Sequence, residues 1–403
     1  MTRRRPANQP SRDPYARDPY ARDSYAPQSR SSRSARGHAS KSRLPMSYED
    51  ASSLSRERSA SRYVRQRKAR SRKKLAFRTL TGVGLVLAAA LVALVVYVAA
   101  LQAQLGSGVS PELRQVLSPA PLDKPFYMLL LGTDKSAERA QSAEFGADSS
   151  NYRTDSMILA RIDPATKHVT LVSIERDTLV TIGSYGQQKI NAAYSLGGAP
   201  LTVETVSKFA GVPISHYAEI NFDEFVGIVD KIGGIDVNIK IDLDDDMADL
   251  HLKAGEQTIN GAQALALCRS RHAYDAYGGG DYYRTANQRM VIGAILKKVL
   301  AANPVTMLTS VGDLAGSVTT DFSVVDILRL MMAFRGFNIS QDLYSGLEPT
   351  NSSYVNGTWY ETVNEPAWRT MMERVDQGLS PYSDASQDFT SHVAGGDPTV
   401  SEG

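Results

Sequence analysis

Cysteine is almost absent from this sequence: Cys268 is the only one among 403 residues. A lone thiol cannot form a disulfide within the chain, so any folded domain must be stabilised by its own apolar core. Cys268 ends the apolar run ALALC, and a cysteine in such a run is typical of buried packing. No cysteine chemistry is therefore expected.

Several enzyme motifs are also missing. The sequence contains no Gly-x-Ser-x-Gly, no His-Glu-x-x-His and no Walker loop, which argues against α/β-hydrolases, zinc proteases and P-loop nucleotide hydrolases. The basic segment 1–74 shows no helix-turn-helix pattern, so no nucleic-acid partner is expected.

Positive charge is concentrated before one long apolar run. Residues 1–74 contain 21 Lys and Arg against 6 Asp and Glu, whereas the rest of the chain contains 24 against 37. Residues 82–101 carry no charge and are long enough as a helix to cross a bilayer. The basic run 65–74 precedes them, and the positive-inside rule then places the N-terminus in the cytoplasm and the later residues outside the cell membrane. A cleaved signal peptide is the alternative, but the basic region is too long for one.

Composition divides the chain into five expected parts. Residues 1–74, rich in Arg and Ser and with the repeats RDPYA, RDPYA and RDSYA, cannot bury enough surface to fold, which predicts a disordered cytoplasmic tail whose charge suits anionic membrane lipid. Residues 80–102 form the single transmembrane helix and 103–124 a linker. Residues 125–376 form the folded domain, and 377–403 a flexible polar tail.

Strands and helices alternate through the folded domain. Residues 126–131, FYMLLL, are typical of a central strand, and residues 157–162 and 169–174 form a hairpin around the turn DPAT. Helices are expected at 201–210, 220–232, 261–268, 291–300, 324–334 and 367–375, and a second hairpin at Asn356-Gly357. This order predicts an α/β fold, an α/β/α sandwich with a central mixed sheet.

The first hairpin presents charge at one end only. Arg153 and Asp155 begin it and Arg176 and Asp177 end it, so folding at the turn brings all four to one sheet edge. Arginine forks match phosphate oxygens, and neighbouring aspartates orient the arginines or hold a divalent cation. Asp134 follows the central strand and joins this edge as a metal or phosphate candidate. A surface ion-pair cluster and, for Asp134, a structural turn remain the alternatives.

A second group of arginines lies later in the chain. Arg269 and Arg271 are two residues apart and would share a face in an extended backbone. The glycines at 278–280 allow close approach to a ligand, and Asp281 opens a helix on which Arg284 and Gln288 share a face. The acidic segment 241–251 lacks the frame of a calcium loop and is expected to be a solvated loop outside the site.

Seven short motifs, taken in order, resemble the LytR-CpsA-Psr family. They are LLLGTD (129–134), RTDSM (153–157), SIERD (173–177), KINAAYSLGG (189–198), DEFVGIVDKIGGIDV (223–237), RSR (269–271) and GDYYRTANQ (280–288). Members of that family are membrane-anchored enzymes of bacteria with Gram-positive type walls, with one span and an outer catalytic domain.

The resemblance implies a phosphotransferase of cell-wall assembly. It would move a glycopolymer from a polyprenyl-pyrophosphate carrier onto peptidoglycan through a phosphodiester, with the lipid tail in an apolar pocket between sheet and helices. The polymer stays open among teichoic acid, capsular polysaccharide and arabinogalactan. The implied cofactor is Mg²⁺, with Mn²⁺ as the alternative.

The family's roles carry over by position. Asp134 and Asp155 would bind the metal; Arg153, Arg176, Arg269 and Arg271 would hold the phosphates; Lys189, Asn191, Arg284 and Gln288 would complete the substrate pocket; and Asp177 and Asp281 would orient arginines or assist proton transfer. The catalytic set is then Arg153, Asp155, Arg176, Asp177 and Asp281. Two positions depart from the family, which usually has proline at Glu175 and arginine at Asn287.

Two other functions remain open. The same site would allow hydrolysis of the carrier pyrophosphate, with water as the acceptor. A lipid-binding regulatory membrane protein of the transcriptional-attenuator type is the second, although the span separates the basic tail from the domain.

Overall fold

The computed structural model describes residues 47–133, 154–303, 306, 309–312, 315–355 and 357–395. The chain divides into two units, Met1–Val83 and Gly84–Gly403.

Helix α1 (Tyr48–Leu105) contains the expected span. It is long and apolar enough to cross a membrane, by length and composition alone. Residues 48–74 also belong to this helix, although the sequence predicted them to be disordered, because Arg, Lys, Gln and Ala are strong helix formers. Residues 1–46 of the predicted tail lie outside the described residues.

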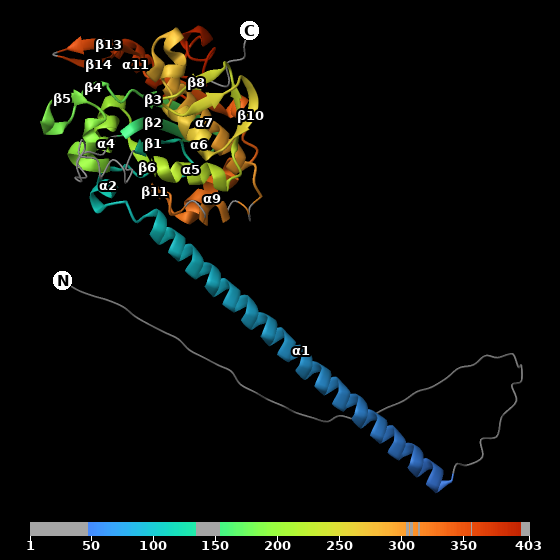
Figure 1. The fold of residues 1–403 in the computed structure, drawn as a ribbon. Coiled ribbons are helices and arrows are strands. Elements are labelled where there is room, and N and C mark those ends of the chain that lie inside the picture. The colour runs from blue at the N-terminus through green and yellow to red at the C-terminus, as the bar shows by residue number, and fades with distance from the viewer. Residues whose placement is uncertain are drawn as a thin grey trace, which may run out of the picture. The chain divides into compact units, whose positions relative to one another are not determined.

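A six-stranded mixed sheet forms the centre of the second unit (Figure 1). Its strands, in spatial order, are β11 (Val318–Thr320), β6 (Ile214–Asn221), β1 (Phe126–Thr133), β2 (Thr154–Asp163), β3 (His168–Ile174) and β12 (Leu343–Leu347). β1 runs parallel to β6, and β3 runs parallel to β12, whereas the other neighbours are antiparallel. The predicted central strand and hairpin are confirmed.

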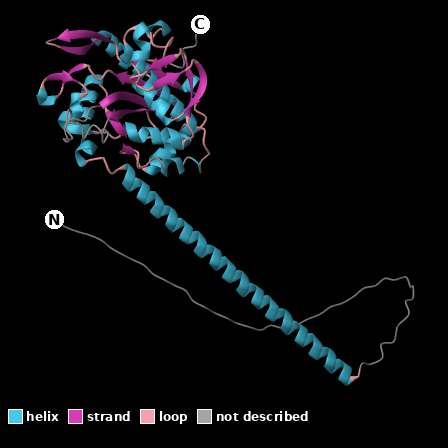
Figure 2. Ribbon diagram, viewed as in Figure 1, coloured by secondary structure: helices cyan, strands magenta, loops and turns pink. Residues whose placement is uncertain are grey.

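Helices cover both faces of this sheet (Figure 2). Alternate residues of β1 enter different cores: Leu129 belongs to one with Trp368, and Met128 to another with Leu300. The first face is covered by α2 (Pro111–Val116), α4 (Ala192–Ala210) and α11 (Glu365–Asp376); the second by the end of α1 with α7 (Gly280–Leu300) and α9 (Val324–Ala333). The predicted α/β/α sandwich is confirmed. The predicted linker is part of it, since Leu113 of α2 is buried.

A third core lies beside α7. Its elements are α5 (Phe222–Lys231), α6 (Gly261–Arg269), β7 (Ile235–Ile239), β8 (Leu243–Asp245), β9 (Leu250–Leu252) and β10 (Gly255–Ile259). Cys268 is buried here as expected, and burial raises the pKa of its thiol to about 12. The helix expected at 220–232 is present as α5, which begins two residues later because strand β6 runs to Asn221. One prediction was wrong: segment 241–251 is a β-hairpin rather than a loop, because Leu243, Leu250 and Asp245 are buried.

Short elements complete the domain. They are β4 (Leu179–Thr181), η2 (Gly183–Tyr185), β5 (Gln187–Lys189), η3 (His272–Tyr277), α10 (Ile339–Asp342), β13 (Thr350–Val355), β14 (Thr358–Val363) and η4 (Ala385–Gln387). The Asn-Gly signal is confirmed by the β13–β14 hairpin. Residues 377–395 were expected to be loose, but they pack on the domain and bury Tyr382, Asp388 and Thr390.

Candidate active site

The start of β2 and the end of β3 meet at one edge of the sheet. The register pairs Met157 with Ile174, which brings Asp155 beside Arg176. Arg176 Nη1 donates to Asp155 Oδ1 at 2.9 Å, so the charge cluster predicted from the hairpin forms. Asp134 and Arg153, which were expected at the same edge, lie outside the described residues.

The N-terminus of α7 joins this edge from the second arginine cluster. Arg284 donates from Nε and Nη2 to both oxygens of Asp281, at 2.9 and 3.0 Å, and from Nη1 to the carbonyl of Asp155 at 2.8 Å. Arg271 Nη1 lies 3.6 Å from the same Asp281 carboxylate. Burial alone would raise the pKa of Asp281, but the charges of Arg284 and Arg176 outweigh it and lower that pKa.

Arg176 is the central cation of this arrangement. Burial works against its charge, but the carboxylates of Asp281, Asp155 and Asp177 outweigh burial and raise its pKa. Its Nε is buried and has no hydrogen-bond partner among the described residues. An unused charged donor of this kind suits an anionic oxygen.

Two buried glutamates, whose contact the sequence did not predict, lie beneath the charged edge. Glu175 and Glu348 are each 1% exposed, and Glu348 Oε2 accepts from the backbone N–H of Glu175 at 2.9 Å. Burial, the Asp281 carboxylate and the Glu348 carboxylate raise the pKa of Glu175 well above its ordinary value. Burial likewise raises the pKa of Glu348 to about 8, although Thr178 also donates to it. Glu175 therefore adds an acid beside the site, and its raised pKa favours the neutral form.

Asp177, Lys189 and Asn191 form the next part of the edge. Lys189 Nζ lies 3.0 Å from Asp177 Oδ1 and 5.8 Å from the ring centroid of Tyr360. Asn191 is buried, and its N–H donates to the carbonyl of Arg176 at 3.2 Å. These predicted substrate-binding residues are thus adjacent to the arginine cluster.

Two neighbouring residues of α7, Gln288 and Asn287, point into the protein core. Gln288 donates to the carbonyl of Cys268 at 3.0 Å and is buried, so its amide supports α6 instead of facing a ligand. Asn287 donates to Tyr274 Oη at 2.7 Å in the core. The loss of the family's arginine at Asn287 therefore removes no cation from the described edge.

Arg269 and Arg271 do not share an extended segment. Arg269 is the last residue of α6, and only Ser270 between them has extended backbone angles. The Arg269 guanidinium lies 4.9 Å from the ring centroid of Phe222, whereas Arg271 approaches Asp281. Both remain exposed and available to a ligand.

Strand β6 adds a carboxylate that the sequence did not indicate. Glu219 is buried and accepts from the hydroxyl groups of Thr133, Tyr194 and Tyr217 at 2.6 to 3.2 Å. It lies next to Thr133, which directly precedes Asp134. Two of its partners, Thr133 and Tyr194, come from other elements of the fold, so the sequence of β6 alone does not reveal the cluster.

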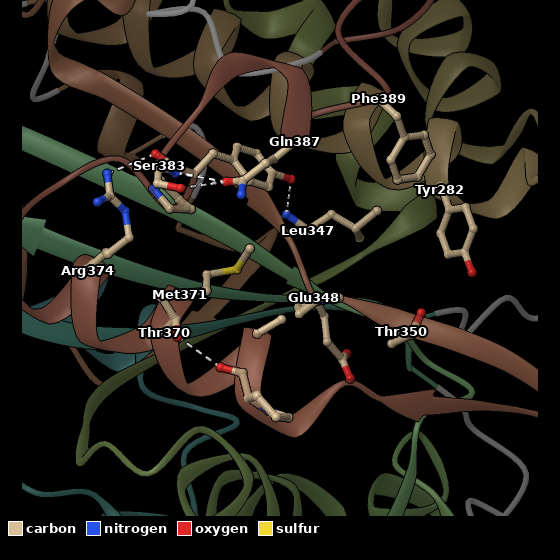
Figure 3. Close-up of a pocket in the computed structure, with 15 residues that line it drawn as sticks. Tyr282, Leu347, Glu348, Thr350, Thr370, Met371, Arg374, Ser383, Gln387 and Phe389 are labelled. Atoms are coloured by element: carbon tan, nitrogen blue, oxygen red, sulfur yellow. Dashed lines mark hydrogen bonds between the residues drawn. The ribbon is translucent and has the colours of Figure 1, made fainter.

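A cavity of about 610 Å³ is lined in part by Glu348, one of the two buried glutamates (Figure 3). Its lining includes Glu348, Tyr282 and Thr350 together with Met371 and Phe389. Glu348 accepts from the N–H of Glu175, the residue before Arg176, so the cavity lies close to the strand end that carries this arginine.

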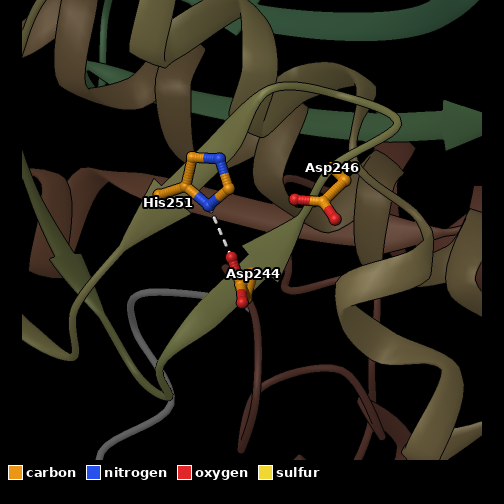
Figure 4. Close-up of side chains that lie close together, drawn as sticks. All are labelled: Asp244, Asp246 and His251. Atoms are coloured by element: carbon orange, nitrogen blue, oxygen red, sulfur yellow. Dashed lines mark hydrogen bonds and ion pairs between the residues drawn. The ribbon is translucent and has the colours of Figure 1, made fainter.

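Another acidic group lies outside the site. Asp244, Asp246 and His251 gather on the β8–β9 hairpin, with His251 Nδ1 bonded to Asp244 (Figure 4). All three are exposed. Their place agrees with the exclusion of segment 241–251 from the predicted site.

This combination of an α/β/α sandwich with arginines and aspartates at one sheet edge defines a domain suited to a phosphate-bearing ligand. Residues 100–377 match the LytR_cpsA_psr family. The chain belongs to the LytR-CpsA-Psr family.

Named relatives support this assignment. The polyisoprenyl-teichoic acid–peptidoglycan teichoic acid transferase TagV of Bacillus subtilis (strain 168) is 32% identical over 273 residues, which cover 63% of this chain and 65% of that protein. The transferase TagU of Enterococcus faecalis is 35% identical over 263 residues, 64% of this chain and 79% of that protein. The crystal structure of B. subtilis TagV matches with a TM-score of 0.55 and 28% identity, over 64% of this chain and 98% of that one.

Proposed function

We propose that this chain is a membrane-anchored phosphotransferase that moves a glycopolymer from a polyprenyl-pyrophosphate carrier onto peptidoglycan. The observation that carries the proposal is the joined cluster in which Arg176 and Arg284 are oriented by Asp155 and Asp281. The relatives are teichoic acid transferases, which supports a glycopolymer of the teichoic acid type.

The reaction exchanges one phosphate ester for another. A hydroxyl oxygen of the acceptor glycan attacks the phosphorus that carries the glycopolymer. The bond from that phosphorus to the bridging oxygen breaks, and polyprenyl phosphate leaves. The hydroxyl proton passes to a base, and the product is a phosphodiester between polymer and peptidoglycan.

The residues of the edge perform positioning and charge stabilisation, which is most of what phosphoryl transfer requires. Arg176 and Arg284 lie where they can hold pyrophosphate oxygens, and exposed Arg271 can extend the grip. Asp281 is held by two bonds from Arg284 and acts in orientation. The carboxylate of Asp177 forms an ion pair with Lys189, and it is then the candidate to accept the proton.

The donor chemistry at this edge fits a hard divalent cation. Asp155 offers carboxylate oxygens, and the neighbouring Thr154 Oγ1 is buried without a hydrogen-bond partner among the described residues. Oxygen ligands are those that Mg²⁺ prefers and Mn²⁺ accepts. Asp155, together with Asp134, would hold the ion, which supplies positive charge to the pyrophosphate oxygens when bound.

The membrane topology belongs to the same proposal. The apolar part of α1 spans the cell membrane once, with the basic residues before it in the cytoplasm and the catalytic domain outside. This arrangement gives the domain access to both a lipid-linked donor and the cell wall.

The test is a reconstituted reaction. The full chain in lipid nanodiscs is incubated with a polyprenyl-pyrophosphoryl saccharide, Mg²⁺ and a peptidoglycan oligomer, and the saccharide is followed by mass spectrometry. We expect a saccharide-phosphate adduct on the oligomer that is lost on chelation and restored by Mg²⁺ or Mn²⁺. Free sugar phosphate without an adduct would make the chain a hydrolase, and donor binding without turnover would make it a regulatory protein.

A further inference from the structure

The β13–β14 hairpin presents an aromatic pair to solvent. Tyr354 and Trp359 are direct cross-strand partners, and each is 61% exposed. Their ring centroids lie 5.1 Å apart at an interplanar angle of 52°. Two adjacent exposed rings of this size indicate an interaction surface.

One face of this hairpin connects the aromatic pair to the charged edge. Side chains alternate along a strand, so the cross-strand pairs Tyr354–Trp359 and Ser352–Glu361 lie on the same face. Ser352 Oγ donates to Glu361 Oε1 at 2.6 Å, and Tyr282 Oη donates to Glu361 Oε2 at 3.2 Å. This strip, which we name the hairpin face, comprises Ser352, Tyr354, Trp359 and Glu361.

The base of the hairpin is attached to the site itself. The N–H of Glu361 donates to the carbonyl of Asp177 at 3.0 Å, and Tyr282 directly follows Asp281 on α7. On the opposite face of the hairpin, Tyr360 lies against Lys189, the partner of Asp177. The hairpin face therefore begins at the carboxylates of the site and ends in exposed rings.

The chemistry of the hairpin face fits a neutral sugar chain. The negative face of an aromatic ring attracts the slightly positive C–H edge of a sugar, and hydroxyl and carboxylate groups bond its hydroxyls. The hairpin face carries a carboxylate and no cation, which makes it unsuited to the polyanionic donor that the arginines would bind.

We propose that the hairpin face binds the acceptor glycan strand of peptidoglycan, with a sugar ring on Trp359 and Tyr354 and the strand directed past Tyr282 to the phosphates. This inference rests on the proposed function and assigns its acceptor subsite.

A lipid surface is the other occupant that exposed aromatic residues suit. Figure 1 shows the hairpin at the end of the domain away from the point where α1 enters it. At that point Leu101 and Leu105 are buried in one core with Val324 of α9. The geometry of this unit thus favours the glycan over the membrane surface.

The chain's tryptophans provide a direct test. Trp359 is exposed, whereas Trp368, the second of two, is 3% exposed. The full chain in nanodiscs is titrated with uncross-linked peptidoglycan glycan oligomers, without donor or metal. We expect the tryptophan emission to shift to the blue and to lose its quenching by acrylamide as Trp359 is covered.

Affinity for the same oligomers, measured by calorimetry, identifies the residues. Trp359→Ala and Tyr354→Ala should each weaken binding about tenfold. Tyr185→Ala is the matched control, since that tyrosine is 51% exposed on the neighbouring β4–β5 connection, and it should leave affinity unchanged. Circular dichroism melting curves identify any variant that fails to fold, and Trp359→Phe, which keeps a ring, should retain most of the affinity.

The outcomes separate this inference from the proposed function. Unchanged affinity in folded Trp359→Ala and Tyr354→Ala overturns the acceptor subsite, even if the wild-type chain performs transfer. Quenching of Trp359 by spin-labelled lipid before glycan is added also overturns it and assigns the hairpin face to the membrane. Glycan binding that depends on Trp359, with no transfer when donor is supplied, supports the subsite and refutes the transferase.

Discussion

The exposed acidic hairpin β8–β9 and the buried acidic group beside α7 contain similar side chains in different surroundings. Asp244 and Asp246 are exposed to solvent, and the hydrogen bond that His251 donates to Asp244 raises the pKa of this histidine. Glu175 and Glu348 are buried, and burial raises their own pKa values instead. Solvent and salt screen an exposed carboxylate, whereas burial favours the protonated form of a carboxyl group unless a cation lies beside it.

Asp281 is a half-buried carboxylate that is stabilised by neighbouring cations. It lies beside Glu175, yet Arg284 and Arg176 lower its pKa while that of Glu175 is raised. A high local number of acidic residues in a sequence is therefore a poor guide to the position of the active site. The density is highest in segment 241–251, and the chemistry lies at isolated acids that contact arginines.

The largest effect is expected for Asp281→Asn. The change removes the charge that orients Arg284 and Arg271 toward the phosphates, and transfer activity should fall about 100- to 1000-fold. Initial rates with the lipid-linked donor measure the effect. Asp246→Asn, an identical substitution on the exposed hairpin, is the control and should change the rate less than twofold. Equal losses of transfer rate in the two variants would show that the exposed acidic hairpin matters as much to the reaction as Asp281.

Next in size is the effect of Glu348→Gln on stability against pH. The folded pKa of about 8 exceeds the ordinary value of 4.5, so the folded state binds the extra proton. The stability contributed by Glu348 is complete below about pH 4.5 and is lost as the pH rises through about 8. Between pH 6 and 9 the wild-type melting temperature should fall by about 5 °C more than that of the variant. If the melting temperatures of both proteins changed equally between pH 6 and 9, the folded state would not raise the pKa of Glu348.

Glu175→Gln should have a smaller effect on activity than Asp281→Asn. The raised pKa of Glu175 favours its neutral form, which glutamine resembles in charge and shape, so the rate should stay within about fivefold of wild type, less than about 1 kcal/mol. Rates at pH 6, 7 and 8 test this. A loss as large as that of Asp281→Asn would mean that Glu175 acts as a carboxylate.

The smallest effect is expected for the double variant Asp244→Asn, Asp246→Asn. Both side chains are exposed, and the free energy of unfolding should change by less than about 0.5 kcal/mol. Urea unfolding of the full chain measures this value. A change above 2 kcal/mol would show that the exposed hairpin contributes to the fold through its charges.

The features that could be predicted from the sequence are those determined by residues close together in the chain. The β2–β3 hairpin followed from a four-residue turn between two aliphatic runs, and the Asp155–Arg176 contact followed from the hairpin. What remained hidden depends on contacts between distant segments. Glu348 bonds the backbone of Glu175 across 173 positions, and no periodicity records such a contact.

The errors have the same origin. Gln288 has the spacing to share a face with Arg284, but the neighbouring α6 offers it a backbone carbonyl, and a buried amide must take such a partner. Segment 241–251 reads as polar because its two leucines are outnumbered, yet they are the residues that fix the hairpin. Asp134 and Arg153 stay predictions, since they lie outside the described residues.

The way in which α1 joins the domain determines how the site is oriented relative to the end of this helix. Leu101 and Leu105 are buried in the core, and Gln102 Oε1 accepts from the N–H of Val324 at 2.9 Å, so the last turns of the helix are part of the folded domain. At such a joint the domain has to turn with the helix end. One residue inserted just before Leu101 would swing the catalytic edge by about 100° around the helix axis, and four residues would lift it by about 6 Å. The end of α1 is thus joined rigidly to the domain, and it sets the orientation of the arginine cluster around the helix axis.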